Sequence, residues 1–120
     1  MIDSEKTQIF HNPRCSKSRQ TLELLKGKGI EPEIIEYLQK PPDIEELEHI
    51  LTLLKLEPRQ LMRTHEKEYS KLELGNPKLS RDQLIRAMVD HPILIERPIV
   101  IRNNRAMIGR PPEKILELIQ

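Results

Sequence analysis

A short apolar run and the helical pattern after it limit the possible folds of this chain more than any other feature. Residues 7–10, Thr-Gln-Ile-Phe, are typical of a buried strand, and a leucine-rich helical repeat extends from Cys15 to about Lys26. A second apolar run over residues 33–38 predicts another strand after the helix-ending Gly27. Strand, helix and strand within about forty residues are typical of a parallel crossover unit.

The middle of the chain is predicted to be helical. Two helix starts have the spacing of a capping box: Asp43 with Glu46, and Ser80 with Gln83. An apolar stripe at helical spacing follows each of these starts. Residues 64–78 between the two helices are polar and predict turns.

The last third of the chain predicts a hairpin and a final helix. Residues 97–101 are typical of a strand, Asn103-Asn104 suits a tight turn, and residues 105–108 form the returning antiparallel strand. The prolines at 111 and 112 fit the first turn of a helix.

The predicted order is β-α-β, a helical insertion, then β-β-α. This is an α/β arrangement, the order of a thioredoxin-like fold with extra helices between its halves. We therefore expect one domain over residues 1–120, with its core at about 7–40 and 93–119 and the insertion at about 43–90. In such folds a reactive thiol after the first strand faces a proline before a late strand. Pro98 has that place, which predicts a cis Arg97–Pro98 peptide bond.

Cys15 is the only cysteine of the chain, and it stands at the predicted start of the first helix. Free backbone N–H groups and the helix dipole at such a start lower the pKa of a thiol and attract anions. Positive charge from His11, Arg14, Lys17 and Arg19 would act in the same direction wherever these side chains point inward. A lone cysteine is more often a small buried hydrophobe. The helix start and the basic neighbours favour a nucleophile over that structural role.

Ser18 stands where a Cys-x-x-Cys pair has its second cysteine. Its hydroxyl can donate a hydrogen bond to the thiolate but cannot resolve a mixed disulfide, so a redox cycle at Cys15 would need an external thiol. His11 is expected either to form a local hydrogen bond or to lend positive charge to the thiolate.

Three arginines stand next to breaks in the pattern: Arg63, Arg97 and Arg110. A guanidinium is a planar fork that binds an oxyanion through two hydrogen bonds at once. If these arginines converged on Cys15, they would hold a tetrahedral anion against the sulfur, although each alone is more often a solvated surface charge. Arg102 and Arg105 are assigned to the exposed hairpin.

The composition argues against several classes of protein. A net charge of +1 does not favour a nucleic-acid or membrane partner, and no apolar run is long enough to span a bilayer. Residues 1–6 lack the apolar segment of a signal peptide, and one cysteine cannot form an internal disulfide, so we expect a cytoplasmic protein. His49, His65 and His91 have no partners at metal-ligand spacing, so no metal site is expected.

Motifs along almost the whole chain, from about residue 7 to residue 118, resemble the glutaredoxin-coupled arsenate reductase (ArsC) family. In chain order they are Phe10-His11-Asn12-Pro13-x-Cys15, Glu31-Pro32-x-Ile34-Ile35, Tyr37-Leu38-x-x-Pro41-Pro42, Leu61-Met62-Arg63, Asp82-Gln83-Leu84-Ile85, His91-Pro92-Ile93-Leu94-Ile95-x-Arg97-Pro98-Ile99-Val100 and Gly109-Arg110-Pro111.

The resemblance implies a thioredoxin-like fold and a thiol-dependent reduction of arsenate to arsenite. It implies Cys15 as the nucleophile, with His11 favouring its thiolate. The oxyanion-binding residues would be Arg63, Arg97 and Arg110, and the supporting residues Asn12, Ser18 and Pro98. Electrons would come from glutathione as external reductant, and glutaredoxin would clear the resulting disulfide, with no bound cofactor.

Two departures from the family pattern leave alternatives open. Residues 16–18 read Ser-Lys-Ser where the well-known reductases have Gly-Thr-Ser, and the chain ends at Gln120 without their C-terminal extension. Both features resemble a sister branch of arsenate-reductase-like proteins. The first alternative is a glutathione-linked thiol oxidoreductase with another substrate. The second is a polymerase-binding regulator like the Spx proteins, although Ser18 replaces the second thiol of their Cys-x-x-Cys switch.

Overall fold

The computed structural model describes residues 6–119, which form two compact units. One unit combines the chain up to Lys40 with the chain from Arg97, and the other is Pro41–Glu96. The first unit contains β1 (Thr7–Phe10), α1 (Ser16–Gly27), β2 (Glu33–Ile35), β3 (Ile99–Arg102), β4 (Arg105–Ile108) and the 3-10 helix η2 (Pro112–Leu118). The second contains α2 (Ile44–Leu54), α3 (Pro58–Leu61), α4 (Lys67–Lys71), α5 (Arg81–Asp90) and the 3-10 helix η1 (Pro92–Leu94).

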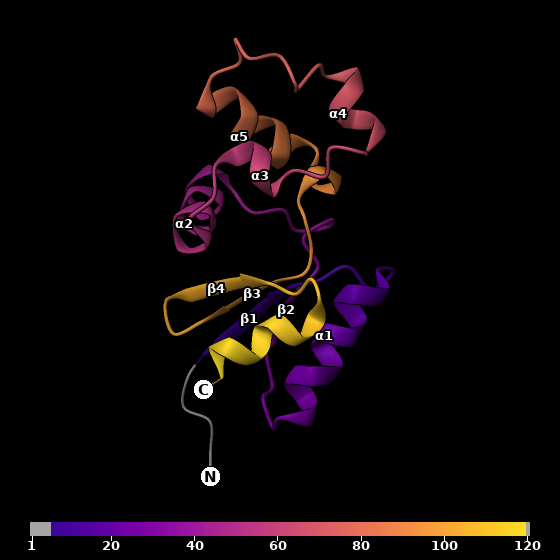
Figure 1. Ribbon diagram of the computed structural model, residues 1–120, viewed down its shortest axis with the longest axis vertical. Helices are drawn as coiled ribbons and strands as arrows, with labels where there is room; N and C mark the ends of the chain where they lie inside the picture. The colour runs from indigo at the N-terminus through magenta and orange to yellow at the C-terminus, as the bar shows by residue number, and fades with distance from the viewer. Residues whose placement is uncertain (1–5, 120) are drawn as a thin grey trace. The chain divides into compact units, whose positions relative to one another are not determined.

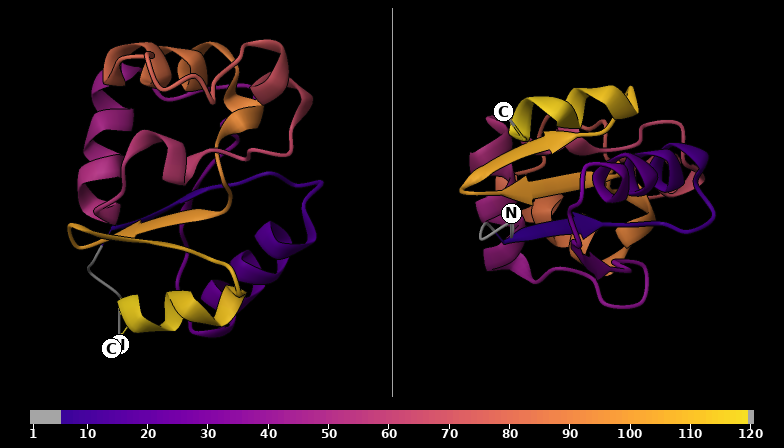
Figure 2. Two further views of the ribbon diagram at one scale, coloured as in Figure 1. Left: turned by 45° about the horizontal axis from the view of Figure 1, so that its top comes forward. Right: turned by 90° about the horizontal axis from the view of Figure 1, so that it is seen from below.

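The first unit is built on a four-stranded mixed sheet with the strand order β2-β1-β3-β4. β1 pairs in parallel with β2, whereas β1 with β3 and β3 with β4 are antiparallel. α1 and η2 lie next to each other on one face of this sheet (Figures 1 and 2). The arrangement confirms the predicted thioredoxin-like order with a helical insertion.

The core of the first unit lies between the sheet and these two helices. Its buried residues are Ile9, Leu25, Ile30, Val100, Ile115 and Leu118. Ile9 pairs with Val100 in the register of β1 and β3, and neither side chain is exposed. Full burial of such a side chain stabilises the fold by about 1.5–3 kcal/mol. This aliphatic layer joins β1 and β3 to α1 and η2.

The second unit is helical, and α2 packs on α5. The buried residues of these helices are Leu47, Ile50, Leu51, Leu84, Ile85 and Met88. Both predicted capping boxes are present: the side chain of Asp43 accepts a hydrogen bond from the backbone of Glu46, and that of Ser80 from Gln83. α4 lies in the stretch predicted as turns, and none of its residues is buried.

Other local predictions differ from the structure in their extent. β2 ends at Ile35 rather than at residue 38, because the backbone N–H groups of Gln39 and Lys40 donate to the carbonyl of Glu36 and close a turn. The last helix is a 3-10 helix. The Arg97–Pro98 bond is cis, as predicted, and the Arg110–Pro111 bond is also cis, which the sequence pattern did not indicate.

The assignment of Arg102 to an exposed hairpin is wrong. Its side chain is buried, and its Nη1 atom donates to Oγ1 of Thr7 at 2.6 Å. β3 has a partner strand on both sides, and Thr7 is the residue opposite Arg102 in the register with β1, so the long side chain lies within the sheet region. Arg105, by contrast, is exposed.

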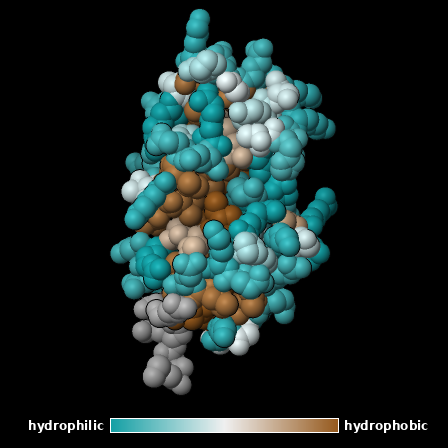
Figure 3. All heavy atoms as spheres, viewed as in Figure 1, coloured by the Kyte–Doolittle hydropathy of each residue, from teal (hydrophilic) through white to brown (hydrophobic). Residues whose placement is uncertain are grey.

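Most of the face shown in Figure 3 is hydrophilic, in keeping with the high content of charged residues. Within residues 6–119, no helix combines the length and the apolar character needed to cross a bilayer.

Candidate active site

Cys15 is the N-cap residue of α1, with an extended backbone (φ −93°, ψ 122°). The loop from β1 reaches it through a turn in which the N–H of Cys15 donates to the carbonyl of Asn12 at 3.0 Å. The thiol is free and partly exposed. The sulfur is therefore accessible at the first turn of the helix, as the position in the sequence predicted.

The surroundings of Cys15 favour its ionised form. Burial by itself would raise the pKa of the thiol. The backbone N–H of Ser18, the side chain of Arg97 and the backbone N–H of Lys17 act against burial by hydrogen bonding to the sulfur, and the charge of Arg97 adds to their effect. The result is a pKa below the ordinary value of 9.0. A larger share of Cys15 is then thiolate near neutral pH, which is the nucleophilic form.

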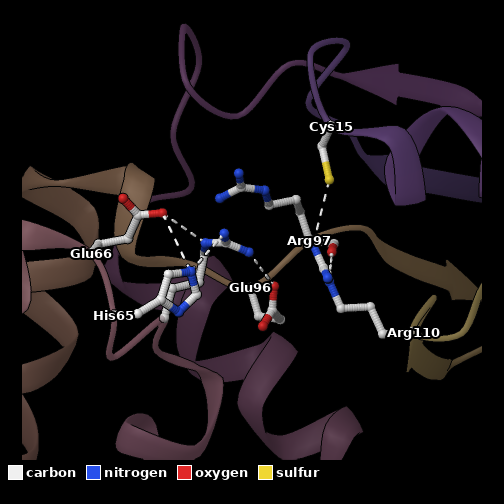
Figure 4. A network of polar contacts seen from close by, with 7 residues as sticks. Cys15, His65, Glu66, Glu96, Arg97 and Arg110 are labelled. Carbon is white, nitrogen blue, oxygen red and sulfur yellow. Dashed lines mark hydrogen bonds and ion pairs between the residues drawn. The ribbon is translucent and has the colours of Figure 1, made fainter.

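Two arginines of the first unit lie beside the sulfur. Nη2 of Arg110 donates to Sγ of Cys15 at 3.4 Å, and Nε of Arg110 donates to the backbone carbonyl of Arg97 at 2.8 Å (Figure 4). The side chain of Arg97 is largely buried. These contacts bring two of the three predicted oxyanion-binding arginines to Cys15 from the segments that flank β3 and β4.

His11 and Ser18 form a buried pair on either side of Cys15 in the sequence. Nδ1 of His11 lies 2.6 Å from Oγ of Ser18, which also accepts from the backbone N–H of Asn12 at 3.0 Å. Burial is the main cause that lowers the pKa of His11; Glu36 opposes this, and Arg19 and Lys26 reinforce it. A lowered pKa favours the neutral imidazole, which is the form that fits the local hydrogen bond to Ser18. The predicted effect of His11 on the thiolate stays a prediction.

The remaining polar residues of the loop hold its shape. Oδ1 of Asn12 accepts from the backbone N–H of Arg14 at 3.0 Å, and Nη1 of Arg19 donates to the carbonyl of Pro13 at 2.9 Å. The side chains of Arg14, Lys17 and Arg19 are exposed. The side-chain charge that lowers the pKa of the Cys15 thiol is that of Arg97. The neighbours in sequence that were expected to contribute charge, His11, Arg14, Lys17 and Arg19, do not.

Arg63, the third predicted arginine, belongs to the other unit and is bound by carboxylates there. Its Nε atom donates to Oε2 of Glu66 at 3.0 Å and its Nη1 atom to Oε1 of Glu96 at 2.8 Å, and its Nη2 atom lies 3.0 Å from Nε2 of His65 (Figure 4). Burial lowers the pKa of Arg63, but both carboxylates raise it and their effect prevails. Its predicted role in binding an oxyanion stays a prediction.

Pro98 directly follows Arg97 and is buried. Its carbonyl accepts from the backbone N–H of Gly109 at 2.9 Å. Gly109 belongs to the Gly109-Arg110-Pro111 motif, between a predicted strand and a predicted helix, but the sequence predicted no role for it.

A surface groove of about 670 Å³ runs along α1 in the same unit. It extends from Ser16 to Lys28 and meets the start of η2 at Pro112 and Glu113. Cys15 does not line this groove, so we keep it apart from the candidate active site. Among the described residues, no three His, Cys, Asp or Glu side chains are grouped so that they could hold a metal ion.

The fold and the site together define a thioredoxin-like protein with one accessible thiol at the start of its first helix. Comparisons with known proteins identify its family. The sequence model of the ArsC family matches residues 10–118. The chain therefore belongs to the ArsC family.

Individual relatives agree with this assignment over almost their full lengths. A protein of Neisseria meningitidis serogroup A named arsenate reductase is 51% identical over 109 residues, which are 90% of this chain and 93% of the relative. The Escherichia coli protein YfgD, described as uncharacterized, is 50% identical over 117 residues, 97% of this chain and 98% of its own. The solved structure of arsenate reductase from Vibrio cholerae matches with a TM-score of 0.94 and 50% identity, covering 97% of this chain and 99% of that one.

Proposed function

We propose that this protein is an arsenate reductase in which Cys15 is the nucleophile and glutathione and glutaredoxin supply the electrons. The observation that carries the proposal is the 3.4 Å contact between Nη2 of Arg110 and Sγ of Cys15, at a helix start where Arg97 also lowers the pKa of the thiol. Relatives named arsenate reductase, at about half identity over most of the chain, support the choice of oxyanion.

In the first step the Cys15 thiolate attacks the arsenic atom of arsenate. One arsenate oxygen takes up protons and leaves as water, and an ester with an S–As(V) bond remains. Arg97 and Arg110 are the residues of the first unit that would hold the anion, because guanidinium groups donate to two of its oxygens at once. The first backbone N–H groups of α1 would add to this seat.

In the second step an external thiol reduces the ester. A glutathione thiolate attacks the Cys15 sulfur, the S–As bond breaks, and its electron pair leaves with arsenic, which is released as arsenite. Glutaredoxin then attacks the Cys15–glutathione disulfide and returns Cys15 as a thiolate. The single cysteine of the chain is the reason for an external partner, because Ser18 cannot resolve the disulfide. No bound cofactor is needed, and the free thiol fits the cytoplasm.

The test is release of arsenite by the purified protein. Arsenate, glutathione and glutaredoxin are supplied together and then with each omitted in turn, and Cys15→Ser is the control. We expect arsenite only with the complete mixture and only from the unaltered protein. Arsenite formation no faster than with Cys15→Ser would overturn the proposal.

The same experiment separates the two alternatives. Lys17 is exposed at a position where the well-known reductases have threonine, and this observation favours a thiol oxidoreductase with another substrate. A Cys15–glutathione disulfide that forms and is cleared without arsenate would support that reading. Capture of RNA polymerase subunits, without turnover of arsenate, would support a regulator instead.

A further inference from the structure

Gly109 lies where three segments of the first unit meet. It follows the last residue of β4 and precedes Arg110, and its backbone N–H donates to the carbonyl of Pro98 at 2.9 Å. The third segment is α1, which contacts this point through Thr21. Both partners of Gly109 are residues of the thiol-bearing unit.

The space at Gly109 admits no side chain. A Cβ atom there would lie 2.5 Å from Oγ1 and 3.1 Å from Cγ2 of Thr21, and 2.9 Å from Cγ of Pro98. Distances below 3.0 Å force a shift of the neighbouring atoms. Since φ of Gly109 is outside the left-handed region, the glycine is needed for space and not for its backbone conformation.

Neither neighbour can yield easily. The side chain of Thr21 is fully buried, and its Oγ1 atom donates to the carbonyl of Lys17 at 2.8 Å. A β-branched side chain in a helix has few alternative rotamers. Pro98 is a buried ring directly before β3. The strain of an added methyl group would therefore move the backbone segments apart.

The segments that would separate are those that carry the site. Thr21 is on α1, whose N-cap is Cys15; Pro98 directly follows Arg97, and Gly109 directly precedes Arg110. The hydrogen bond from Nη2 of Arg110 to the sulfur, 3.4 Å long, joins the segment after Gly109 to the start of α1. Moving these segments apart at Gly109 would lengthen this hydrogen bond and weaken it.

We propose that Gly109 is a positioning residue: its lack of a side chain lets α1 approach the two arginine-bearing segments closely enough for Arg97 and Arg110 to reach the sulfur of Cys15. The inference deepens the proposed function, since it concerns the same thiol. The backbone N–H of Gly109 is bound to the carbonyl of Pro98, so Gly109 would act through the segments that carry Cys15, Arg97 and Arg110.

The test compares Gly109→Ala with Gly27→Ala. Gly27 is at the end of α1, where a Cβ atom would meet nothing within 4 Å, so it controls for the loss of a glycine as such. Thr21→Ala and the double variant Thr21→Ala/Gly109→Ala test the cause, because truncating Thr21 removes two of the three close contacts. The readout is the rate of Cys15 alkylation by iodoacetamide as a function of pH, with thermal unfolding measured in parallel.

We expect the alkylation profile of Gly109→Ala to move to higher pH, with a rate about tenfold lower at mildly acidic pH. Gly27→Ala should keep the original profile. The double variant should recover part of the loss relative to Thr21→Ala, as expected for two residues in contact.

An unchanged profile in folded Gly109→Ala would overturn the inference, and so would a double variant that recovers nothing. If Gly109→Ala does not fold, the double variant takes its place. Failure of both to fold would also count against the inference, because Gly109 would then serve the fold as a whole. Alkylation needs no arsenate, so these results are independent of whether arsenate is the substrate.

Discussion

Nη2 of Arg110 lies 3.4 Å from Sγ of Cys15, although the two residues are 95 positions apart in the chain. Gly109 directly follows the antiparallel pair β3 and β4 and lies against Thr21 of α1. Arg110 is the next residue, and it can therefore reach Cys15 at the N-terminus of the same helix. The charge of a guanidinium at this distance stabilises a thiolate more than a thiol. The surroundings of the thiol therefore include the residues next to β3 and β4 as well as the start of α1.

Arg97→Lys should weaken oxyanion binding more than it weakens the fold. Lysine keeps the positive charge but loses the planar fork, so we expect the KM for arsenate to rise about tenfold. The melting temperature should change little by comparison. Steady-state kinetics and thermal unfolding measure the two effects. Arg105 is an exposed arginine of β4, and Arg105→Lys is the matched control. Equal kinetics for both variants would contradict the assignment of Arg97.

The thiol of Cys15 should react at a lower pH in the folded protein than in the unfolded chain. Its pKa is below 9.0 in the folded state because hydrogen bonds from backbone N–H groups and Arg97 outweigh burial. The alkylation rate should therefore reach half of its maximum at lower pH in buffer than in concentrated urea. Coincident profiles would show that the helix start and Arg97 have no effect on the sulfur.

The lowered pKa of Cys15 also predicts that the stability of the fold depends on pH. A group with a lowered pKa in the folded state adds stability above its unfolded pKa and loses it as the pH falls through the folded pKa. The free energy of unfolding of the unaltered protein, relative to Cys15→Ser, should accordingly increase as the pH rises toward 9. Chemical denaturation of both proteins at several pH values measures it, and a difference independent of pH would contradict the prediction.

His11 should make the free energy of unfolding depend on pH in a second, acidic range. Burial lowers its pKa below 6.5, so the unfolded state binds the proton first and stability falls as the pH decreases through this region. His11→Gln should lose this dependence. Nuclear magnetic resonance of the imidazole protons measures the titration directly, and a midpoint at or above 6.5 would be inconsistent with a neutral partner for Ser18.

Glu96→Gln should destabilise the second unit through Arg63. The Arg63 side chain is 11% exposed and is held by Glu66 and Glu96, so removing one carboxylate weakens a partly buried charged hydrogen bond at a cost of about 1–2 kcal/mol. Glu48→Gln is the control, because the Arg81–Glu48 pair is about 40% exposed on both sides and should matter less. If urea denaturation gave the same loss of unfolding free energy for Glu96→Gln and Glu48→Gln, the burial of the Arg63 ion pair would not matter for stability.

Short-range signals account for what was predicted well. Each capping box lies within four residues, and Asn103 and Asn104 both have the positive φ values, 53° and 59°, that a tight hairpin requires. The place of Cys15 at a helix start also follows from neighbouring residues. Such features depend on local backbone geometry, which a few side chains are enough to determine.

Contacts between distant segments were beyond the sequence pattern. Nothing near Arg102 indicates that it pairs with Thr7, and nothing near Arg63 indicates that Glu96 binds it. Arg97 and Arg110 were candidates from their positions, but spacing gave no reason why they should meet at the sulfur.

The sequence alone determined the order of helices and strands and the presence of one thiol at a helix start, because both follow from local periodicity and capping. Only the tertiary structure decided which charges surround that thiol, and that Gly109 leaves the space for them. Distances across paired strands and packed helices depend on how whole segments fit together, and no stretch of neighbouring residues contains that information.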